Sequence, residues 1–448
     1  MELLSRIRYT LWGPFTVLFL LATGAYLTWQ TRFVQFWCLP QLLRQRRRTA
    51  GTGGISPWQA LCTSLGGTLG VGNLAGVAIA ITLGGPGAVF YMLIAAFFGM
   101  ATKYAELLLA VRYQISDGAP LGGPMVYLSR GAELPGLGRA FAVCCACAAL
   151  GTGAAAQGGA IAEAVSPLLP VPPLLIGILA ALLLLPILRG GGQRIARASA
   201  VLVPAMTVLY LAGGGTVLFR YRDRLPDALL SIVHGAAEPF AAGGGILGLL
   251  TARAIADGFS KGVFSNEAGM GSAPIAHGCT AGARPCEEGL LGAVEVFLDT
   301  FVVCLTTALV ILVTGAHESG ARGLAMTVTA FESIFGRFSY GFIAVTVVFL
   351  AVSTVFGWSF YGLACLRFLR ARRLLRAIYP VGTVISVAAA SLVPLPDLLT
   401  LCDISAALML FPNLIGLWTL APEVRRATCA FRRKNALSIG TRRKFTVF

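Results

Sequence analysis

Long apolar runs alternate with short polar stretches along the whole chain. A helix needs roughly 20 apolar residues to cross the hydrocarbon core of a bilayer. Counted in this way, the pattern predicts eleven spans, at residues 11–36, 57–82, 86–111, 141–163, 171–189, 197–219, 228–278, 289–315, 339–366, 374–394 and 399–421. The seventh of these is long and interrupted. The sequence therefore predicts an all-α polytopic membrane protein with about eleven transmembrane helices.

One predicted span contains a cluster of glycines. They lie within residues 62–80 and are Gly66, Gly67, Gly70, Gly72 and Gly76. Each glycine weakens a helix by roughly 1 kcal/mol relative to alanine. Unwound backbone at membrane depth is tolerated only where it is buried in protein or lines a cavity. We therefore interpret this stretch as a broken helix that forms a binding site.

A second glycine-rich interruption lies in the seventh span. Residues 243–250 read GGGILGLL, and a polar, glycine-rich segment follows from Ser265 to Gly271. If the chain contains two units of five helices, both interruptions fall in the first helix of their unit. Because five is odd, the second unit is inverted, and paired interruptions of this kind indicate a transporter site at the membrane midplane.

This interpretation divides the chain into four parts. An N-terminal helix and a basic cytoplasmic loop cover residues 1–56, and the first repeat covers residues 57–220. The inverted second repeat covers residues 221–422, and a basic cytoplasmic tail covers residues 423–448.

Composition agrees with a membrane protein. Of the 448 residues, 56% are hydrophobic and only 12% are charged, and the mean hydropathy of +0.79 excludes an ordinary soluble domain. The net charge of +16 comes from short basic clusters between apolar segments. Such clusters are typical of cytoplasmic loops and not of a nucleic-acid-binding surface. With these clusters in the cytoplasm, we expect the N-terminus to lie outside and the C-terminus in the cytoplasm.

No enzymatic motif is visible. The chain lacks an HExxH pair, a P-loop and a GxSxG motif with a plausible triad. The eleven cysteines are scattered and the three histidines are far apart, so the sequence does not favour a zinc site. A transporter with this sequence would therefore draw its energy from an ion gradient.

Several polar residues inside the spans are candidates for binding, and each has a structural alternative. Glycine-rich backbone can hold a carboxylate through free N–H groups, or it can permit close helix packing. Ser265, Asn266 and Gln157 can contact a ligand or a neighbouring helix. Ser353 and Thr354 can bond their own helix, or they can join unwound carbonyls in an oxygen cage for a monovalent cation.

The charged residues inside the spans are open to more than one interpretation. Lys103 and Glu106 are three residues apart and are predicted to pair on one helical face. Glu267 is suited either to a structural pairing or to transport. Asp299 and Asp403 are further candidates, including for a proton relay.

Long strings of residues closely resemble the alanine/glycine:cation symporter family, the sodium:alanine symporters. They are GNLAGVAIAITLGGPGA at 72–88, GMATKYAELLLAVRY at 99–113, GPMVYL at 123–128, GVFSNEAGMGSAPIAH at 262–277 and STVFGWSFYG at 353–362. The resemblance extends from Trp12 to Trp418. It implies an inner-membrane symporter with the LeuT-type fold, one extra helix before a ten-helix core, and uptake of alanine or glycine with sodium.

The resemblance also implies roles for individual residues. Gly70, Val71 and Gly72 would bind the substrate carboxylate, Gln157, Ser265 and Asn266 would face its amino and carboxyl groups, and Trp358 would form part of a small apolar wall. Ser353 and Thr354, with carbonyl groups near Gly66 and Leu69, would hold sodium as the coupling ion. No other cofactor is implied, and the partners would be a small neutral amino acid, sodium and the lipid bilayer.

The chain departs from the family pattern at two places. Val71 stands where the family usually has threonine, so one hydroxyl that could reach the carboxylate is absent. A lost hydrogen bond to a charged group costs roughly 1.5–3 kcal/mol if nothing replaces it. Gly158 and Gly159 follow Gln157, where the family tends to carry Asn-Ser.

The sequence favours sodium-coupled uptake of a small neutral amino acid by alternating access. Two alternatives stay open. A proton could replace sodium, using Glu267, Asp299 or Asp403, or the chain could be an amino-acid sensor that binds without transporting.

Overall fold

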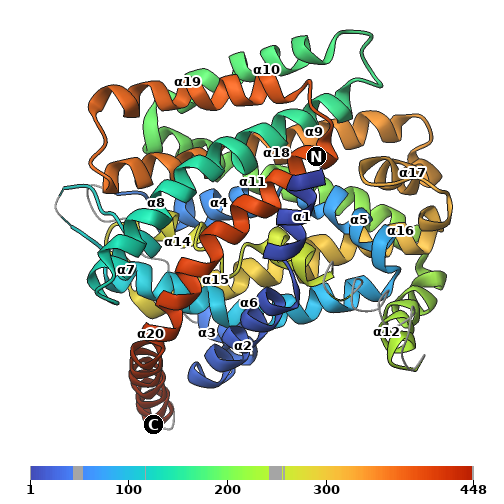
Figure 1. The fold of residues 1–448 in the computed structure, drawn as a ribbon. Helices are drawn as coiled ribbons and strands as arrows, with labels where there is room; N and C mark the ends of the chain where they lie inside the picture. Colours follow the sequence, from blue (N-terminus) through green and yellow to red (C-terminus); the bar gives the residue numbers. More distant parts are fainter. Residues whose placement is uncertain (1, 44–53, 117, 242–254, 256–257, 446–448) are drawn as a thin grey trace.

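The computed structural model describes residues 2–43, 54–116, 118–241, 255 and 258–445. Within these residues the structure is helical, and extended pairing is limited to isolated bridges between Ile55 and Thr280 and between Ile115 and Leu121. Most of the long helices lie side by side, running across the view of Figure 1. The architecture is therefore all-helical, as predicted.

The helices of the first half overlap the predicted spans, with helices at residues 2–11 and 124–130 in addition and the first span divided between two helices. They are α1 (Glu2–Leu11), α2 (Pro14–Gln30), α3 (Val34–Leu43), α4 (Pro57–Thr68), η1 (Val71–Asn73), α5 (Ala75–Gly84), α6 (Gly87–Arg112), α7 (Pro124–Arg130), α8 (Pro135–Leu150), the π-helical turn η2 (Gly151–Ala155), α9 (Ala156–Val165), α10 (Pro173–Leu188) and α11 (Gly191–Arg220).

The second half contains helices that the sequence does not predict as separate elements. Its helices are η3 (Arg222–Arg224), α12 (Leu225–Ala241), α14 (Ala273–His277), α15 (Pro285–Val296), the π-helical segment η4 (Phe297–Cys304), α16 (Leu305–Thr314), η5 (Ala316–Glu318), α17 (Leu324–Phe335), α18 (Phe338–Phe368), α19 (Arg373–Ala390) and α20 (Leu395–Phe445). Residues 258–266 are also helical. Helix α17 has no counterpart among the predicted spans, and α20 continues well beyond the span predicted to end at residue 421.

Length and apolar composition identify membrane-spanning helices among the described residues. Seven helices qualify, or eight if α4 and the segment from Val71 to Gly84 are counted as one span bent by 57°. Helices α10 and α17 are apolar but shorter. The protein is thus a multi-pass membrane protein, and eleven spans stay a prediction.

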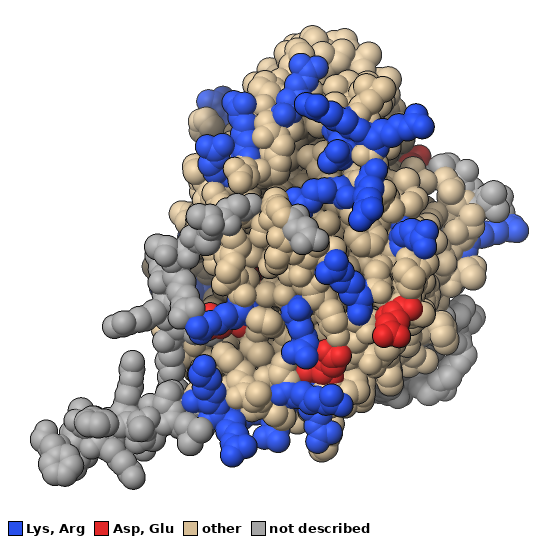
Figure 2. All heavy atoms as spheres, turned by 90° about the vertical axis from the view of Figure 1, so that its left-hand side faces the viewer, with Lys and Arg blue, Asp and Glu red and all other residues tan. Residues whose placement is uncertain are grey.

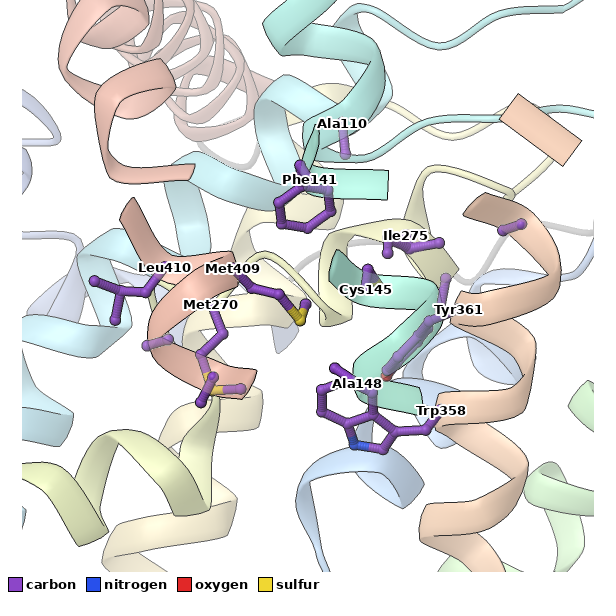
Figure 3. Close-up of a cluster of buried hydrophobic side chains, with 14 of the residues drawn as sticks. Ala110, Phe141, Cys145, Ala148, Met270, Ile275, Trp358, Tyr361, Met409 and Leu410 are labelled. Atoms are coloured by element: carbon purple, nitrogen blue, oxygen red, sulfur yellow. The ribbon is translucent and has the colours of Figure 1, made fainter. Parts of the chain in front are cut away.

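Helix α8 lies at the centre of the main hydrophobic core. Figure 3 shows its side chains packed between α18 and α20; the labelled residues of these helices are Phe141, Cys145, Ala148, Trp358, Tyr361, Met409 and Leu410. By contrast, α10 exposes large apolar side chains, with Leu182 60% and Leu183 77% exposed. An apolar exterior of this kind is suited to contact with lipid.

Basic side chains gather on one face of the molecule. Figure 2 views the side that lies to the left in Figure 1, and Lys and Arg are spread over it while Asp and Glu are sparse. The turn between α18 and α19 and the first turn of α19 contribute exposed arginines, Arg370, Arg372, Arg373 and Arg376. We refer to this side as the basic face.

The first broken helix is the one that the glycine cluster predicted. Helix α4 starts with a capping box, in which Ser56 Oγ accepts from the Gln59 N–H and Gln59 Oε1 accepts from the Ser56 N–H. The chain leaves the α-helix at residues 69–74 and re-enters it in α5. Helix α4 lies toward the basic face and α5 lies on the other side (Figure 1).

The second broken helix has its break at residues 267–272, between the helical residues 258–266 and α14. Glu267, Gly269 and Gly271 have φ angles of +54°, +89° and +79° there, which a right-handed helix cannot accommodate. This break falls within the polar segment that starts at Ser265, whereas residues 243–250 lie outside the described residues. Helix α14 contacts α4 and also lies toward the basic face.

Candidate substrate and cation site

The first break packs closely against α18 because its glycines lack side chains. A Cβ atom on Gly67 would lie 2.6 Å from the Tyr361 hydroxyl, and one on Gly70 would lie 2.8 Å from Thr354 Oγ1. Real Cβ atoms do not approach other heavy atoms so closely. The glycines therefore bring the unwound backbone of α4 within reach of the α18 hydroxyls.

The four residues predicted to hold sodium come together at this contact. Thr354 Oγ1 lies 3.1 Å from the carbonyl oxygen of Gly66 and 3.4 Å from that of Leu69. Ser353 Oγ lies 3.5 Å from the Gly66 oxygen. Both hydroxyls are also within hydrogen-bond distance of the Leu350 carbonyl of their own helix, at 2.8 and 2.9 Å. The geometry thus permits both alternatives for these hydroxyls, a hydrogen bond to their own helix and a place in an oxygen cage with the carbonyls of α4.

Unwinding frees the two carbonyl groups for such contacts. In a continuous helix the Gly66 oxygen would accept from the Gly70 N–H, and the Leu69 oxygen would accept from the Asn73 N–H. Instead, the Gly70 N–H donates to Asn73 Oδ1 at 2.9 Å, and the Asn73 N–H donates to the Gly70 oxygen at 3.1 Å. An arrangement of carbonyl and hydroxyl oxygens is what a hard cation requires. The sodium role itself stays a prediction.

Asn73 links the first break to the second. Its Nδ2 lies 2.7 Å from Asp299 Oδ1 and 3.1 Å from Ser265 Oγ, and Ser265 donates to Asp299 Oδ2 at 2.8 Å. All three side chains are at most 1% exposed. Asp299 therefore joins the first break to the helix that precedes the second break, which favours a structural part for it over a free proton carrier.

Two of the three residues predicted to bind the substrate carboxylate keep unused donors, whereas the Gly70 N–H is bonded to Asn73. Within the described part of the chain, the N–H groups of Val71 and Gly72 have no hydrogen-bond acceptor. A Cβ atom on Gly72 would lie 3.2 Å from the ring of Phe264, which belongs to the helix before the second break. The first break therefore lies against the helix that precedes the second break.

Gln157 occupies the first turn of α9, directly after the π-helical turn η2. Its Nε2 donates to the Thr152 carbonyl at 3.2 Å, and its buried Oε1 has no partner among the described residues. Gly158 and Gly159 have a packing role, because Cβ atoms there would lie 2.1 Å from the Val387 oxygen and 2.4 Å from Leu398 Cδ1. The two glycines that stand in place of the family's Asn-Ser therefore let α19 and α20 approach α9.

Asn266 and Trp358 are engaged within the second break. Asn266 Oδ1 accepts from the Ala268 N–H at 3.0 Å, and its Nδ2 lies 3.3 Å from Thr300 Oγ1. Trp358 Nε1 donates to Glu267 Oε1 at 3.0 Å. Both side chains support the turn that follows Ser265, and their contact with substrate stays a prediction.

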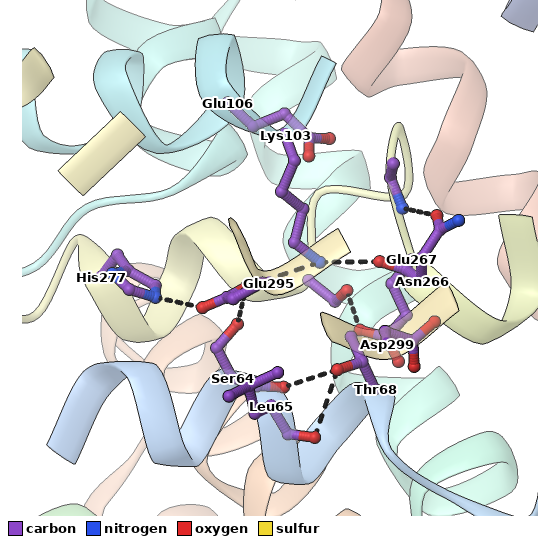
Figure 4. A network of polar contacts seen from close by, with 12 residues as sticks. Ser64, Leu65, Thr68, Lys103, Glu106, Asn266, Glu267, His277, Glu295 and Asp299 are labelled. Carbon is purple, nitrogen blue, oxygen red and sulfur yellow. Dashed lines mark hydrogen bonds and ion pairs between the residues drawn. The ribbon is translucent and has the colours of Figure 1, made fainter. Parts of the chain in front are cut away.

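The buried charges are paired differently from the sequence-based expectation. Lys103 does not bond Glu106; its Nζ donates to the Asn266 carbonyl at 2.8 Å and lies 3.8 Å from Glu295 Oε2 (Figure 4). Glu106 instead accepts from the Gly271 N–H at 3.1 Å and from the Asn413 amide. A spacing of three residues along a helix would permit an ion pair between Lys103 and Glu106. Each side chain instead bonds to the backbone of the segment around the second break.

The other two carboxylates considered for transport are also engaged. Glu267 accepts from Ser272 and from Trp358. Asp403 on α20 forms an ion pair with Lys261 at 3.1 Å, and both side chains are at most 5% exposed. These contacts favour the structural interpretation of both residues.

Three residues that connect the elements of the candidate site are not recognisable as such from the sequence. Asn73, Glu295 and His277 each connect elements that are distant in the chain. Asn73 carries a usable signal, because an amide among glycines at membrane depth needs partners. Glu295 and His277 give no signal beyond being polar in an apolar region.

Comparisons with known proteins agree with this architecture. The model of the sodium:alanine symporter family matches residues 1–445. The sodium/alanine symporter AgcS of Methanococcus maripaludis is 38% identical over 452 residues, covering 97% of this chain and 98% of the relative. The probable sodium/glutamine symporter GlnT of Bacillus subtilis is 32% identical, covering 95% and 89%.

Among solved structures, the crystal structure of a manganese transporter from Eremococcus coleocola is similar in fold, with a TM-score of 0.51 at 13% identity and coverage of 82% of this chain and 76% of that chain. At this identity the similarity concerns the fold alone. On the strength of the family match and the relatives, this chain belongs to the sodium:alanine symporter family, whose members are membrane transporters and not enzymes.

Proposed function

We propose that this protein imports a small neutral amino acid, alanine or glycine, together with sodium by alternating access across the inner membrane. The observation that carries the proposal is the meeting of the Gly66 and Leu69 carbonyls with the Thr354 hydroxyl at 3.1 and 3.4 Å. Sodium would bind among these oxygens and Ser353 Oγ. Its charge would hold the unwound end of α4 against α18.

The substrate would bind at the next residues along the same break. Gly70, Val71 and Gly72 would receive the carboxylate, because the N–H groups of Val71 and Gly72 lack acceptors in the described residues. Gln157 would offer its unpaired Oε1 to the amino group. Ser265 and Asn266 would complete the polar contacts, and Trp358 would limit the size of the side chain.

Coupling follows from the shared backbone. An ion bound at Gly66 and Leu69 would fix the conformation of Gly70 to Gly72, so the substrate would meet preformed donors. By thermodynamic linkage, the substrate must then raise sodium affinity by the same factor. The basic face would lie in the cytoplasm, and residues 57–220 and 221–422 would form the two inverted repeats of a LeuT-type fold.

Uptake by proteoliposomes tests the proposal. Labelled alanine, glycine and glutamine are supplied under a sodium gradient or a proton gradient imposed separately. We expect the sodium gradient alone to drive accumulation of alanine or glycine. Accumulation driven only by protons would replace sodium as the coupling ion, and binding without accumulation would make the protein a sensor.

A further inference from the structure

His277, the last residue of α14, lies between two carboxylates. Its Nδ1 contacts Glu288 Oε2, and its Nε2 lies 2.7 Å from Glu295 Oε1. The imidazole is fully buried, and both glutamates are at most 3% exposed. They stand seven residues apart on α15, which places them on the same side of that helix two turns apart.

The geometry requires one proton more than a neutral histidine and two carboxylates provide. A neutral imidazole has one N–H donor and one lone pair. With a carboxylate oxygen at each ring nitrogen, one of the two contacts would oppose two lone pairs. A second ring N–H, or a protonated carboxyl group, removes this conflict. The cluster of Glu288, His277 and Glu295 therefore holds an extra proton in this conformation.

The surrounding charges agree with that count. Lys103 of α6 lies 3.8 Å from Glu295 Oε2 and is the only other charged group paired with the cluster among the described residues. The remaining titratable groups that face Glu295 are Cys62 of α4 and Tyr361 of α18. Without the added proton, the two carboxylates would have only this lysine as a neighbouring cation, and an uncompensated charge in the dry interior would be costly.

The cluster also connects the two broken helices. Ser64 of α4 donates to Glu295 Oε2 at 2.8 Å, and His277 of α14 contacts Glu295 Oε1, so both half-helices on the basic side are held to α15. Figure 4 shows this chain of contacts from Ser64 through Glu295 to His277. Opening a path between α4 and α14 requires these contacts to separate.

A cavity of about 300 Å³ lies beyond the end of α14, and its lining includes Ile55, Cys279 and Arg367. Cys279 is two residues beyond His277. The lining of the cavity does not include Glu288, His277 or Glu295 themselves.

We propose that Glu288, His277 and Glu295 form a proton-binding site whose proton holds α4 and α14 to α15 and keeps the basic side of the path closed. Loss of the proton sets the His277 lone pair against a carboxylate and favours separation of the half-helices. The site is distinct from the residues proposed for sodium and substrate. Its test needs neither ligand nor transport.

Hydrogen exchange of the purified full-length protein, without sodium or alanine, tests the proposal. Protection of residues 57–68 and 273–280 is compared between pH 6 and 9 after correction for the intrinsic exchange rate, with residues 141–150 of α8 as the reference. Above the pH at which the proton leaves, we expect protection to fall by up to about tenfold per pH unit, as loss of one proton dictates. Equal corrected protection at both pH values would overturn the proposal.

Two substitutions have opposite expected effects. In Glu288→Gln, a neutral His277 can donate to Glu295 and accept from the new amide, so protection should be high at both pH values. In His277→Gln, one carboxylate loses its donor, so protection should be low at both. His317→Gln is the control, because His317 lies 24% exposed beside Glu318 and should keep the wild-type pH dependence.

Glu288→Gln decides the outcome even if His277→Gln fails to fold. A Glu288→Gln protein that keeps the wild-type pH slope would contradict the proton count. Folding of each variant is checked by size-exclusion chromatography before exchange is measured.

Discussion

The two broken helices use glycine for different purposes. In the first break, none of residues 69–74 has a positive φ angle, and the glycines serve close approach to α18. In the second break, Gly269 and Gly271 have φ angles of +89° and +79°, and even Glu267 is at +54°. In the first break glycine is needed because a side chain would not fit, and in the second because the backbone is left-handed.

The two breaks also differ in the side chains that bond to them. The second break is held by buried charges, with Lys103 on the Asn266 carbonyl and Glu106 on the Gly271 N–H. The first break is held by the Thr354 hydroxyl and, through Asn73, by the single carboxylate of Asp299, and the Val71 and Gly72 N–H groups lack acceptors among the described residues. We infer that the second break is a rigid support and the first is the part that responds to ligands.

The largest effect is expected from Gly271→Ala. The new Cβ would lie 2.5 Å from Pro124 Cγ in a left-handed conformation. Left-handed backbone costs an L-residue roughly 1–2 kcal/mol, and overpacking adds roughly 1–3 kcal/mol. The free energy of unfolding should fall by about 2–5 kcal/mol, measured by denaturation in detergent.

Gly315→Ala separates the two contributions to that loss. Gly315 has a similar φ of +74°, and a Cβ atom added there would meet no heavy atom within 4 Å. It should lose only the conformational part. Equal losses at both positions would show that packing around the second break is not tight.

Thr354→Val should weaken sodium binding with little effect on folding. The valine keeps the shape but removes the hydroxyl that lies 3.1 Å from the Gly66 oxygen. A lost contact to a charged group is worth roughly 1.5–3 kcal/mol, or about 10- to 150-fold in affinity. Thr346→Val on the same helix is the control, because Thr346 donates to the Phe342 carbonyl of its own helix. Equal sodium affinities in the two variants would remove Thr354 from the site.

Gly70→Ala should lower sodium affinity by about tenfold, because its Cβ would lie 2.8 Å from Thr354 Oγ1 and overpacking costs roughly 1–3 kcal/mol. Gly76→Ala is the matched variant in α5, where nothing lies within 4 Å. It should leave sodium affinity unchanged and stabilise the helix by up to about 1 kcal/mol. Isothermal titration with sodium compares the two, and a loss of affinity in Gly76→Ala would contradict the distinction.

The smallest effect is expected from Val71→Thr. Val71 is 2% exposed, so an added hydroxyl needs a partner, and the proposed substrate carboxylate supplies one. Alanine affinity should rise by up to about tenfold, the equivalent of roughly 1.4 kcal/mol, while sodium affinity without alanine stays the same. If affinity and selectivity for alanine and glycine are both unchanged, position 71 does not contact the substrate.

The sequence predicts the elements of the candidate site better than their partners. Glycine-rich, polar stretches at membrane depth point to both breaks, and the residues proposed for sodium, among them Thr354 and Gly66, do meet. The preference of Lys103 for the Asn266 carbonyl over Glu106 is not predictable, because it depends on where the second break ends. A single sequence shows spacing along one helix but not the carbonyl groups that another helix exposes.

Hydrophobic periodicity also fails to predict a short helix or a polar contact between distant parts of the chain. Helix α17 has only twelve residues, below the length that identifies a span, so the pattern does not predict it. In the sequence His277 is one of three histidines far apart, although folding places it between two glutamates of α15. In both cases the stabilising partners are supplied by tertiary packing, which no window along the chain contains.

The central claim is that sodium and substrate share the first break. Its most direct test is the sodium affinity of the purified protein, measured with and without saturating alanine. We predict that alanine raises sodium affinity by about 5- to 150-fold, the usual range for coupled sites, and that sodium raises alanine affinity by the same factor. Equal sodium affinity in the presence and absence of alanine would contradict the claim.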